Sequence, residues 1–177
     1  MARAAAAAAP RAPTPPDARA FRDALGRFAT GVAFVTAAPG GEPAGLIVNS
    51  LASVSLDPPL VSFSPSRGSL TWKRMRRTGG FGVNVLGGHH EPFATRATPA
   101  GAPRFAGLDW APGRLGTPLL SDALASFECY IVGEHPAGDH WIVVGRIDNL
   151  RVAEADTDPL VFFRGAFRAI TPSSSRR

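Results

Sequence analysis

Hydrophobic positions fall into short runs, many alternating with polar positions, as is typical of strands. Residues 32–38 (VAFVTAA) and 80–86 (GFGVNVL) are two such runs. Residues 44–65 hold two strand-like stretches separated by Asp57-Pro58-Pro59. Proline cannot donate to a sheet ladder, so these prolines indicate the end of a strand.

The C-terminal half continues this pattern. Residues 125–135 and 140–155 predict a hairpin across the turn PAGD, and residues 159–170 predict a last strand pair. Helical spacing is confined to 17–31 and 69–79, with short helical pieces and loops over 88–116.

The first of these helices has Phe21, Leu25 and Phe28 at helical spacing and Gly31 as a stop, and the second has Ser69 near its start and Gly79 just past its end. At least six strands with few helices predict a mainly β fold, a closed or nearly closed antiparallel barrel.

Length and composition fit one globular domain. The chain has 177 residues, of which 45% are hydrophobic and 19% charged. We expect a disordered Ala/Pro-rich leader over 1–17, the folded domain over 18–170 and a disordered tail over 171–177. No apolar run approaches the ~20 residues of a membrane-spanning helix.

The charge pattern and the cysteine content bear on the binding partners and the cellular compartment of the protein. The net charge is +5, carried by scattered arginines with Lys73 as the only lysine, a pattern that argues against a nucleic-acid-binding stripe. The single cysteine, Cys129, excludes an intramolecular disulfide and fits a reducing compartment, so we expect a cytoplasmic protein.

The segment NSLASVS is rich in small polar residues. Alternation along a strand places Ser53 and Ser55 on one face and Ser50 on the other, beside Asn49. These residues indicate either a ligand-binding strand or an edge strand with a solvated face.

The segment SPSRGSLTWKR enters the second predicted helix. Its free backbone N–H groups suit a phosphate, and Ser69, Thr71, Lys73 or Arg74 could add donors and charge. The alternative is an ordinary N-cap on a surface helix.

His140 follows Asp139 at the start of a strand. It could be a surface or structural residue, a general acid, a metal ligand, or a group facing a nicotinamide. His89 and His90 lie in a loop, and no metal-ligand spacing is present, so we predict no metal site. Neither a G-x-S-x-G elbow nor a G-x-G-x-x-G loop opening a helix occurs.

Taken together, several segments resemble the short-chain flavin reductases, the reductase components of two-component flavin-dependent monooxygenases. The resemblance covers about residues 18–170, and its most specific elements are SVSLDPPL and GDH. The segments that carry it, in order, are FRDALGRFATGVAFVTA, GLIVNSLASVSLDPPLVSF, GGFGVNVL, RFAGLDW, FECYIV, AGDHWIVVGRI and PLVFFRGAF.

The resemblance implies an FMN-binding split barrel that forms a homodimer with flavin near the subunit interface. It implies that NADH or NADPH reduces FMN or FAD by hydride transfer, and that reduced flavin diffuses to a separate monooxygenase. In actinobacteria such reductases often serve aromatic-hydroxylating partners, including those of polyketide pathways. Catalysis would consist of aligning nicotinamide C4 with flavin N5.

The resemblance also implies roles for individual residues. His140 would be the catalytic residue beside the nicotinamide. The other implied contacts are Ile47, Val48, Asn49 and Ser50 at the isoalloxazine; Ser53 and Ser55 toward the ribityl and phosphate; Ser69 and Thr71 at the phosphate; Asn84 beside the flavin; and Phe163 and Arg164 of the C-terminal motif.

Four positions depart from the family pattern. Threonine is usual at Ile47 and frequent at Ala52, and polar rings are usual at Phe163 and Phe167. A more apolar site would also fit two alternatives, namely an enzyme of this fold that retains its flavin and acts on its own organic substrate, or a non-catalytic flavin-binding protein.

Overall fold

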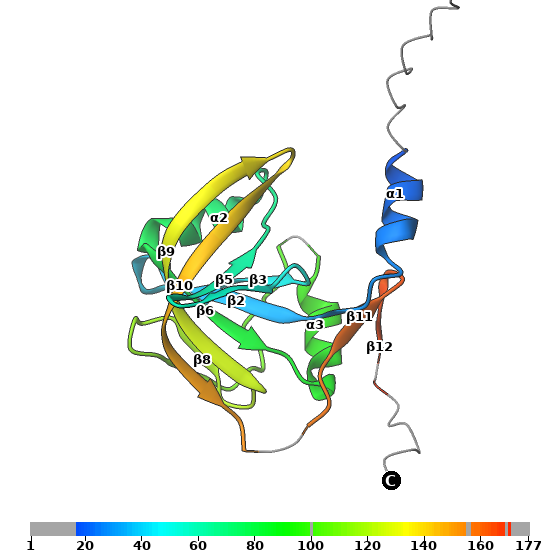
Figure 1. The fold of residues 1–177 in the computed structure, drawn as a ribbon. Coiled ribbons are helices and arrows are strands. Elements are labelled where there is room, and N and C mark those ends of the chain that lie inside the picture. The colour runs from blue at the N-terminus through cyan, green and yellow to red at the C-terminus, as the bar shows by residue number, and fades with distance from the viewer. Residues whose placement is uncertain (1–16, 100, 155–156, 169, 171–177) are drawn as a thin grey trace, which may run out of the picture.

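A computed structural model describes residues 17–99, 101–154, 157–168 and 170. It shows a curled sheet flanked by short helices, with an arm projecting to one side (Figure 1). The elements are α1 (Ala18–Leu25), β1 (Thr30–Gly31), β2 (Ala33–Ala37), η1 (Pro39–Gly41), β3 (Ala44–Val48), β4 (Ala52–Leu56), β5 (Pro59–Phe63), α2 (Leu70–Met75), η2 (Arg76–Thr78), β6 (Gly80–Val85), η3 (Gly88–His90), α3 (Glu91–Ala97), β7 (Trp110–Pro112), β8 (Pro118–Leu120), β9 (Ala125–Ala137), β10 (His140–Val152), β11 (Val161–Phe163) and β12 (Ala166–Arg168).

The main sheet has seven antiparallel strands in the order β3-β2-β6-β9-β10-β5-β4. Flat, such a sheet would hold its outer strands about 29 Å apart. Residues 49–51, which join β3 to β4, allow roughly 14 Å between Val48 and Ala52. The sheet therefore curls until its two edges approach each other, which confirms the nearly closed antiparallel barrel.

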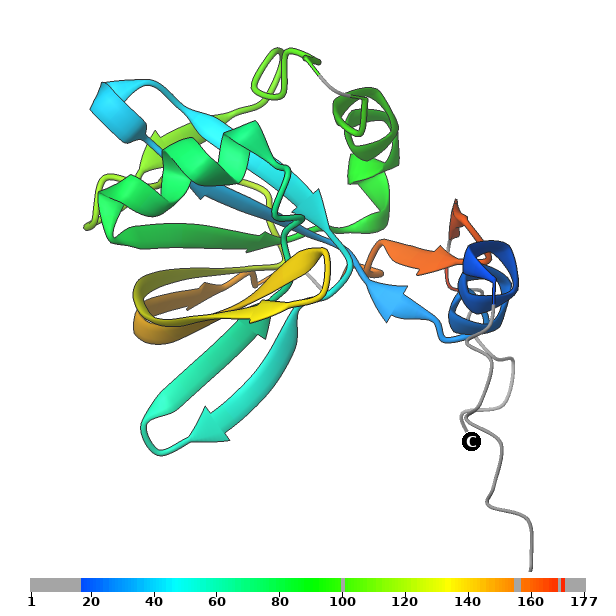
Figure 2. The same ribbon diagram turned by 90° about the horizontal axis from the view of Figure 1, so that it is seen from above.

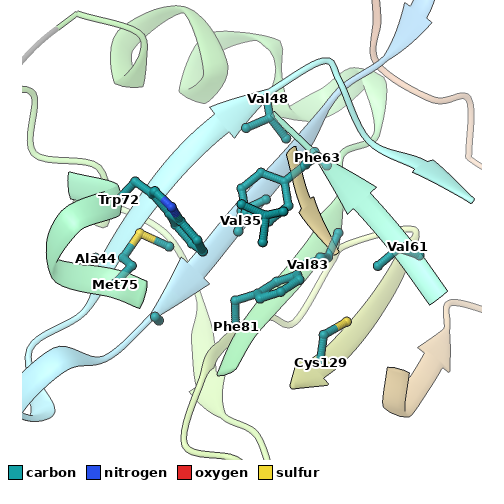
Figure 3. Close-up of a cluster of buried hydrophobic side chains, with 13 residues drawn as sticks. Val35, Ala44, Val48, Val61, Phe63, Trp72, Met75, Phe81, Val83 and Cys129 are labelled. Atoms are coloured by element: carbon teal, nitrogen blue, oxygen red, sulfur yellow. The ribbon is translucent and has the colours of Figure 1, made fainter. Parts of the chain in front are cut away.

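The interior of the curled sheet is filled by aromatic side chains. Phe63 packs edge-on against Trp72 and Phe81, with ring centroids 5.2 and 5.1 Å apart, and Met75 and Cys129 are fully buried beside them (Figure 3). Trp72 and Met75 come from α2, so this packing fixes α2 against the barrel.

A second buried cluster lies on the other side of β2. Phe34 is fully buried and meets Phe93 of α3 edge-on, with centroids 5.0 Å apart. Leu86 and Leu160 also belong to this cluster, and its packing positions α3 and the start of β11.

The second predicted helix is confirmed. The Ser69 hydroxyl caps α2 by accepting from the Trp72 backbone N–H at 3.1 Å, and Gly79 ends η2 with φ +73°, which favours glycine. The first helix is shorter than predicted, because α1 ends at Leu25 with Gly26 as its cap and Gly31 lies in β1.

The arm consists of α1 and the small sheet β1-β11-β12 and projects away from the barrel (Figures 1 and 2). The predicted leader and tail fall outside the described residues except for Asp17, whose carboxylate caps α1. No residue of α1 is buried, although its spacing is amphipathic. Among the described residues, no helix is long and apolar enough to cross a membrane.

Candidate functional site

The candidate site lies along β3, which has β2 as its single strand partner in the described part of the chain. Two hollows of about 280 Å³ each adjoin residues 46–49. The first hollow is completed by Val32, Ala97, Thr98, Arg104, Phe162 and Phe167. The second hollow is completed by Ser50, Ser64, Pro65, Ser66, Ser69 and His140.

The open edge of β3 supplies backbone donors and acceptors, since every second residue of an edge strand directs its N–H and C=O away from the sheet. Ile47 is half-buried and Asn49 is exposed. Together with Phe162 and Phe167, Ile47 gives the first hollow an apolar wall. An apolar wall beside a row of backbone polar groups suits a flat ring with a polar edge.

His140 belongs to the second hollow, where it is 47% exposed. A β-bridge to Ser66 and a hydrogen bond from the Trp141 N–H to the Pro65 carbonyl, 2.9 Å long, hold the start of β10. The imidazole Nδ1 lies 2.8 Å from an Asp139 carboxylate oxygen. Hydrogen bonding to His140 lowers the pKa of Asp139. A carboxylate only accepts, so Nδ1 carries the proton and Nε2 remains available to a ligand.

The serines around the second hollow have defined partners. The Ser50 hydroxyl accepts from the Ser64 backbone N–H at 2.9 Å, which ties the end of β3 to the segment before α2. Ser69 lines the same hollow while capping α2. Thr71 lies on the other side of α2 in a separate hollow, so the structure does not bring the predicted Ser69–Thr71 pair together.

Several predicted site residues lie away from these two hollows. Ser53 and Ser55 are on β4 and line neither hollow, and a register shift between them interrupts the alternation on which their shared face rested. Phe163 and Arg164 lie at the β11–β12 turn, where the Arg164 N–H binds the Gly26 carbonyl at 2.8 Å.

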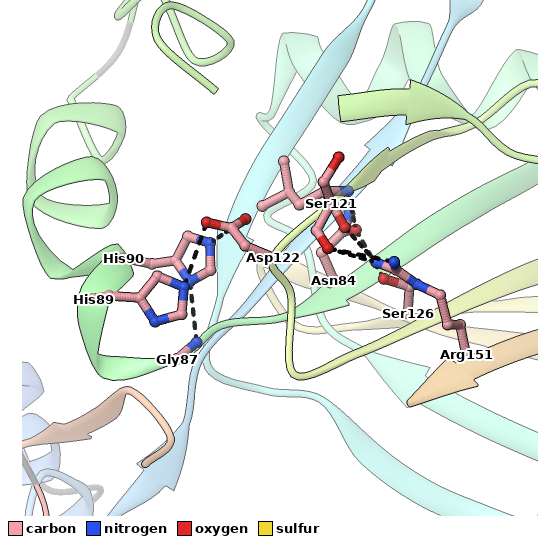
Figure 4. A network of polar contacts seen from close by, with 9 residues as sticks. Asn84, Gly87, His89, His90, Ser121, Asp122, Ser126 and Arg151 are labelled. Atoms are coloured by element: carbon pink, nitrogen blue, oxygen red, sulfur yellow. Dashed lines mark hydrogen bonds and ion pairs between the residues drawn. The ribbon is translucent and has the colours of Figure 1, made fainter. Parts of the chain in front are cut away.

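Asn84 is fully buried in β6 and lines neither hollow. Its amide nitrogen donates to the carbonyls of Phe34 and Pro118, and its oxygen accepts from the Leu120 N–H at 2.8 Å and from the Ser126 hydroxyl at 3.3 Å. Figure 4 shows this residue inside the polar network. The structure thus gives Asn84 a role in joining strands rather than the predicted place beside a ligand.

Arg104 and Phe162 line the first hollow and were not predicted as site residues. Arg104 donates to the Ala97 carbonyl at 3.0 Å and to the Pro99 carbonyl at 3.4 Å, which holds it at the end of α3. Its place in the segment RFAGLDW, which carries part of the family resemblance, was the one available signal.

His89, His90 and Asp122 form the one cluster of metal-ligating type among the described residues (Figure 4). The buried His90 accepts from the Gly87 N–H through Nδ1, so its neutral ring carries the proton on Nε2 and donates to Asp122, each contact at 3.1 Å. A metal on Nε2 would displace that proton to Nδ1, against the Gly87 N–H. The cluster therefore links η3 to the segment after β8 through hydrogen bonds.

The hydrogen-bonded cluster around His90 predicts that the stability of the protein depends on pH. Burial lowers the pKa of His90 below its ordinary value of 6.5, with the Asp122 hydrogen bond opposing that shift. The unfolded chain then binds a proton more readily than the folded one, so the free energy of unfolding falls as the pH drops below about 6.5. We expect His90→Gln to flatten the pH dependence of the urea midpoint between pH 7 and 5, whereas the exposed His135→Gln should leave it unchanged.

Comparison with known proteins identifies the family of this chain. Residues 25–171 match the family described as the flavin reductase like domain. The chain belongs to this family.

Its relatives include the flavin-dependent monooxygenase reductase subunit HsaB of Rhodococcus jostii, 38% identical over 90% of this chain and 81% of that protein. The FMN reductase (NADH) SmoA of Agrobacterium fabrum is 44% identical over 85% of each chain. The NADH:FAD oxidoreductase of Streptomyces globisporus, solved with NAD and FAD fragments, is 32% identical, with a TM-score of 0.84 over 93% of this chain and 100% of that one.

Proposed function

We propose that this protein uses NADH to reduce flavin and releases the reduced flavin to a separate monooxygenase. The carrying observation is that β3 lies between an apolar hollow and a second hollow that contains His140. Flavin accepts a hydride from reduced nicotinamide at N5. The named functions of the relatives, which include NADH-dependent flavin reductases and monooxygenase reductase subunits, support this assignment.

The residues of the chain divide this task between the two hollows. Ile47, Phe162 and Phe167 would cover the flat ring and exclude water from it. The open edge of β3 would bind the polar edge of the ring, and His140 would hold the nicotinamide on the opposite side. Asp139 fixes the imidazole tautomer with the proton on Nδ1, which leaves Nε2 available to contact the nicotinamide.

We further propose that the protein is a cytoplasmic homodimer. On α1 and the turn after it, Phe21, Leu25 and Phe28 are 55%, 54% and 73% exposed, on an arm that projects from the barrel. An amphipathic helix gains stability by covering its apolar face, and a second copy of the chain would supply that cover. The same arm carries Phe162 and Phe167, so dimerisation would steady the wall of the first hollow. The reducing cytoplasm supplies NADH and suits the buried free thiol of Cys129.

The decisive experiment is anaerobic. The purified protein is mixed with excess FMN or FAD, NADH or NADPH is added, and the visible absorbance of the flavin is followed. Bleaching over many turnovers supports the proposal, and sedimentation of the same preparation gives its oligomeric state. A flavin that stays bound and oxidised would contradict it and favour an enzyme that retains its flavin.

A further inference from the structure

A third hollow, of about 350 Å³, lies at the N-terminal end of β3. It lies between the start of that strand, Thr71 and Arg74 of α2, and the loop 102–106. Arg104 lines both this third hollow and the first hollow. A ligand whose ring occupies the first hollow can therefore extend past Arg104 into the third.

The third hollow is cationic. Arg74 and Arg104 both line it, and no carboxylate does so among the described residues. The two hydrogen bonds of Arg104 use two of its five N–H groups, so three remain for a ligand. Arg74 is exposed and has neither an ion pair nor a side-chain hydrogen bond within the described segments. Two guanidinium groups beside the Thr71 hydroxyl suit a diphosphate, whose oxygens accept paired N–H donors.

The third hollow also has an aromatic wall. Phe105 lines it and is held by Phe34 and Trp110, with ring centroids 5.2 and 5.7 Å away. A ring fixed in this way offers a surface on which a purine base can pack. The third hollow therefore offers guanidinium groups for a diphosphate and, next to them, an aromatic ring for a purine base. These are the parts of the adenosine diphosphate half of a dinucleotide.

We propose that the third hollow binds the adenosine diphosphate half of FAD, so that FAD is preferred over FMN. This inference rests on the proposed function. FMN carries only the inner of the two phosphates and no adenosine, so it would reach Arg104 at the entrance of the third hollow and leave Arg74 and Phe105 without a ligand. The dinucleotide NADH would approach from the second hollow, where His140 lies, rather than from the end of β3. The family alone does not decide the matter, because one relative is named an FMN reductase and another an NADH:FAD oxidoreductase.

The test is equilibrium binding of FAD, FMN and riboflavin to the wild type, Arg74→Ala and Arg77→Ala. Arg77 is the matched control, since it lies three residues along the same helical segment and shares a separate hollow with Arg74 but does not line the third hollow. The wild type should bind FAD more tightly than FMN. Arg74→Ala should weaken FAD binding about tenfold, as expected for one hydrogen-bonded ion pair, and leave FMN and riboflavin nearly unchanged. Arg77→Ala should bind all three ligands like the wild type.

Equal affinity of the wild type for FAD and FMN would overturn the inference. So would either of two results for Arg74→Ala: equal losses of FAD and FMN affinity, or a raised KM for NADH with an unchanged FAD affinity. Circular dichroism of each variant excludes misfolding as the cause. If the wild type binds no flavin and NADH reduces none, the proposed function falls as well. Flavin reduction without an FAD preference overturns the FAD assignment alone.

Discussion

Replacing His140 with alanine should slow hydride transfer about 100-fold while leaving flavin affinity close to that of the wild type. His140 lines the second hollow, and its Nδ1 is held by Asp139 at 2.8 Å, so its role would be to position the nicotinamide. Loss of such positioning typically costs about two orders of magnitude in rate, because the reacting atoms must lie within a narrow range of distances. The rate is measured by anaerobic stopped-flow mixing of the flavin-saturated protein with NADH.

The matched control is His135→Ala. His135 is also an exposed histidine of the β9–β10 hairpin and lines none of the three hollows around β3. It should react like the wild type. A parallel titration of flavin fluorescence gives the dissociation constant for each variant. If His140→Ala lost flavin affinity and rate by the same factor, His140 would support the fold of the site and would have no direct role with the nicotinamide.

The strands and the hairpin could be predicted because their signals are local. The signals are the alternation of polar and apolar residues, the prolines at 58 and 59, and the glycine at 79, and each acts on neighbouring residues. The boundaries of β5, β9, β10 and η2 lie within a few residues of the positions that these signals indicated. The β4 bulge could not be predicted, because it arises from pairing with β5 and leaves Val54 without a partner.

The candidate site was only partly predictable for a related reason. Asn49, Ser50 and Ser69 lie in or next to the strand and helix that carry them, so the local sequence already allowed a ligand-binding role for them, and the family resemblance added Ile47 and Val48. Arg104 and Phe162 reach the first hollow only because β3 lies at a sheet edge beside α3 and the arm. That proximity depends on the strand order of the whole sheet, which no local pattern specifies.

Asn84 shows most directly why part of the site could not be predicted from the sequence. A polar residue in an apolar strand can either contact a ligand or form hydrogen bonds to buried groups in the core. The structure places Asn84 among carbonyls and donors of β2, β8 and β9. We expect Asn84→Ala to lower the free energy of unfolding by about 3 kcal/mol, because the Leu120 N–H and two carbonyl groups lose a buried partner. Urea denaturation measures this loss.

Asn49→Ala is the matched control, since it removes the same amide from an exposed position on the first and second hollows. Its unfolding free energy should stay within about 0.5 kcal/mol of the wild type, whereas its flavin affinity should fall. The two variants therefore separate stability from binding. A stable Asn84→Ala protein with weakened flavin binding would contradict the structural role and would place Asn84 in contact with the ligand, because an interior amide needed only for packing cannot alter affinity while leaving the fold intact.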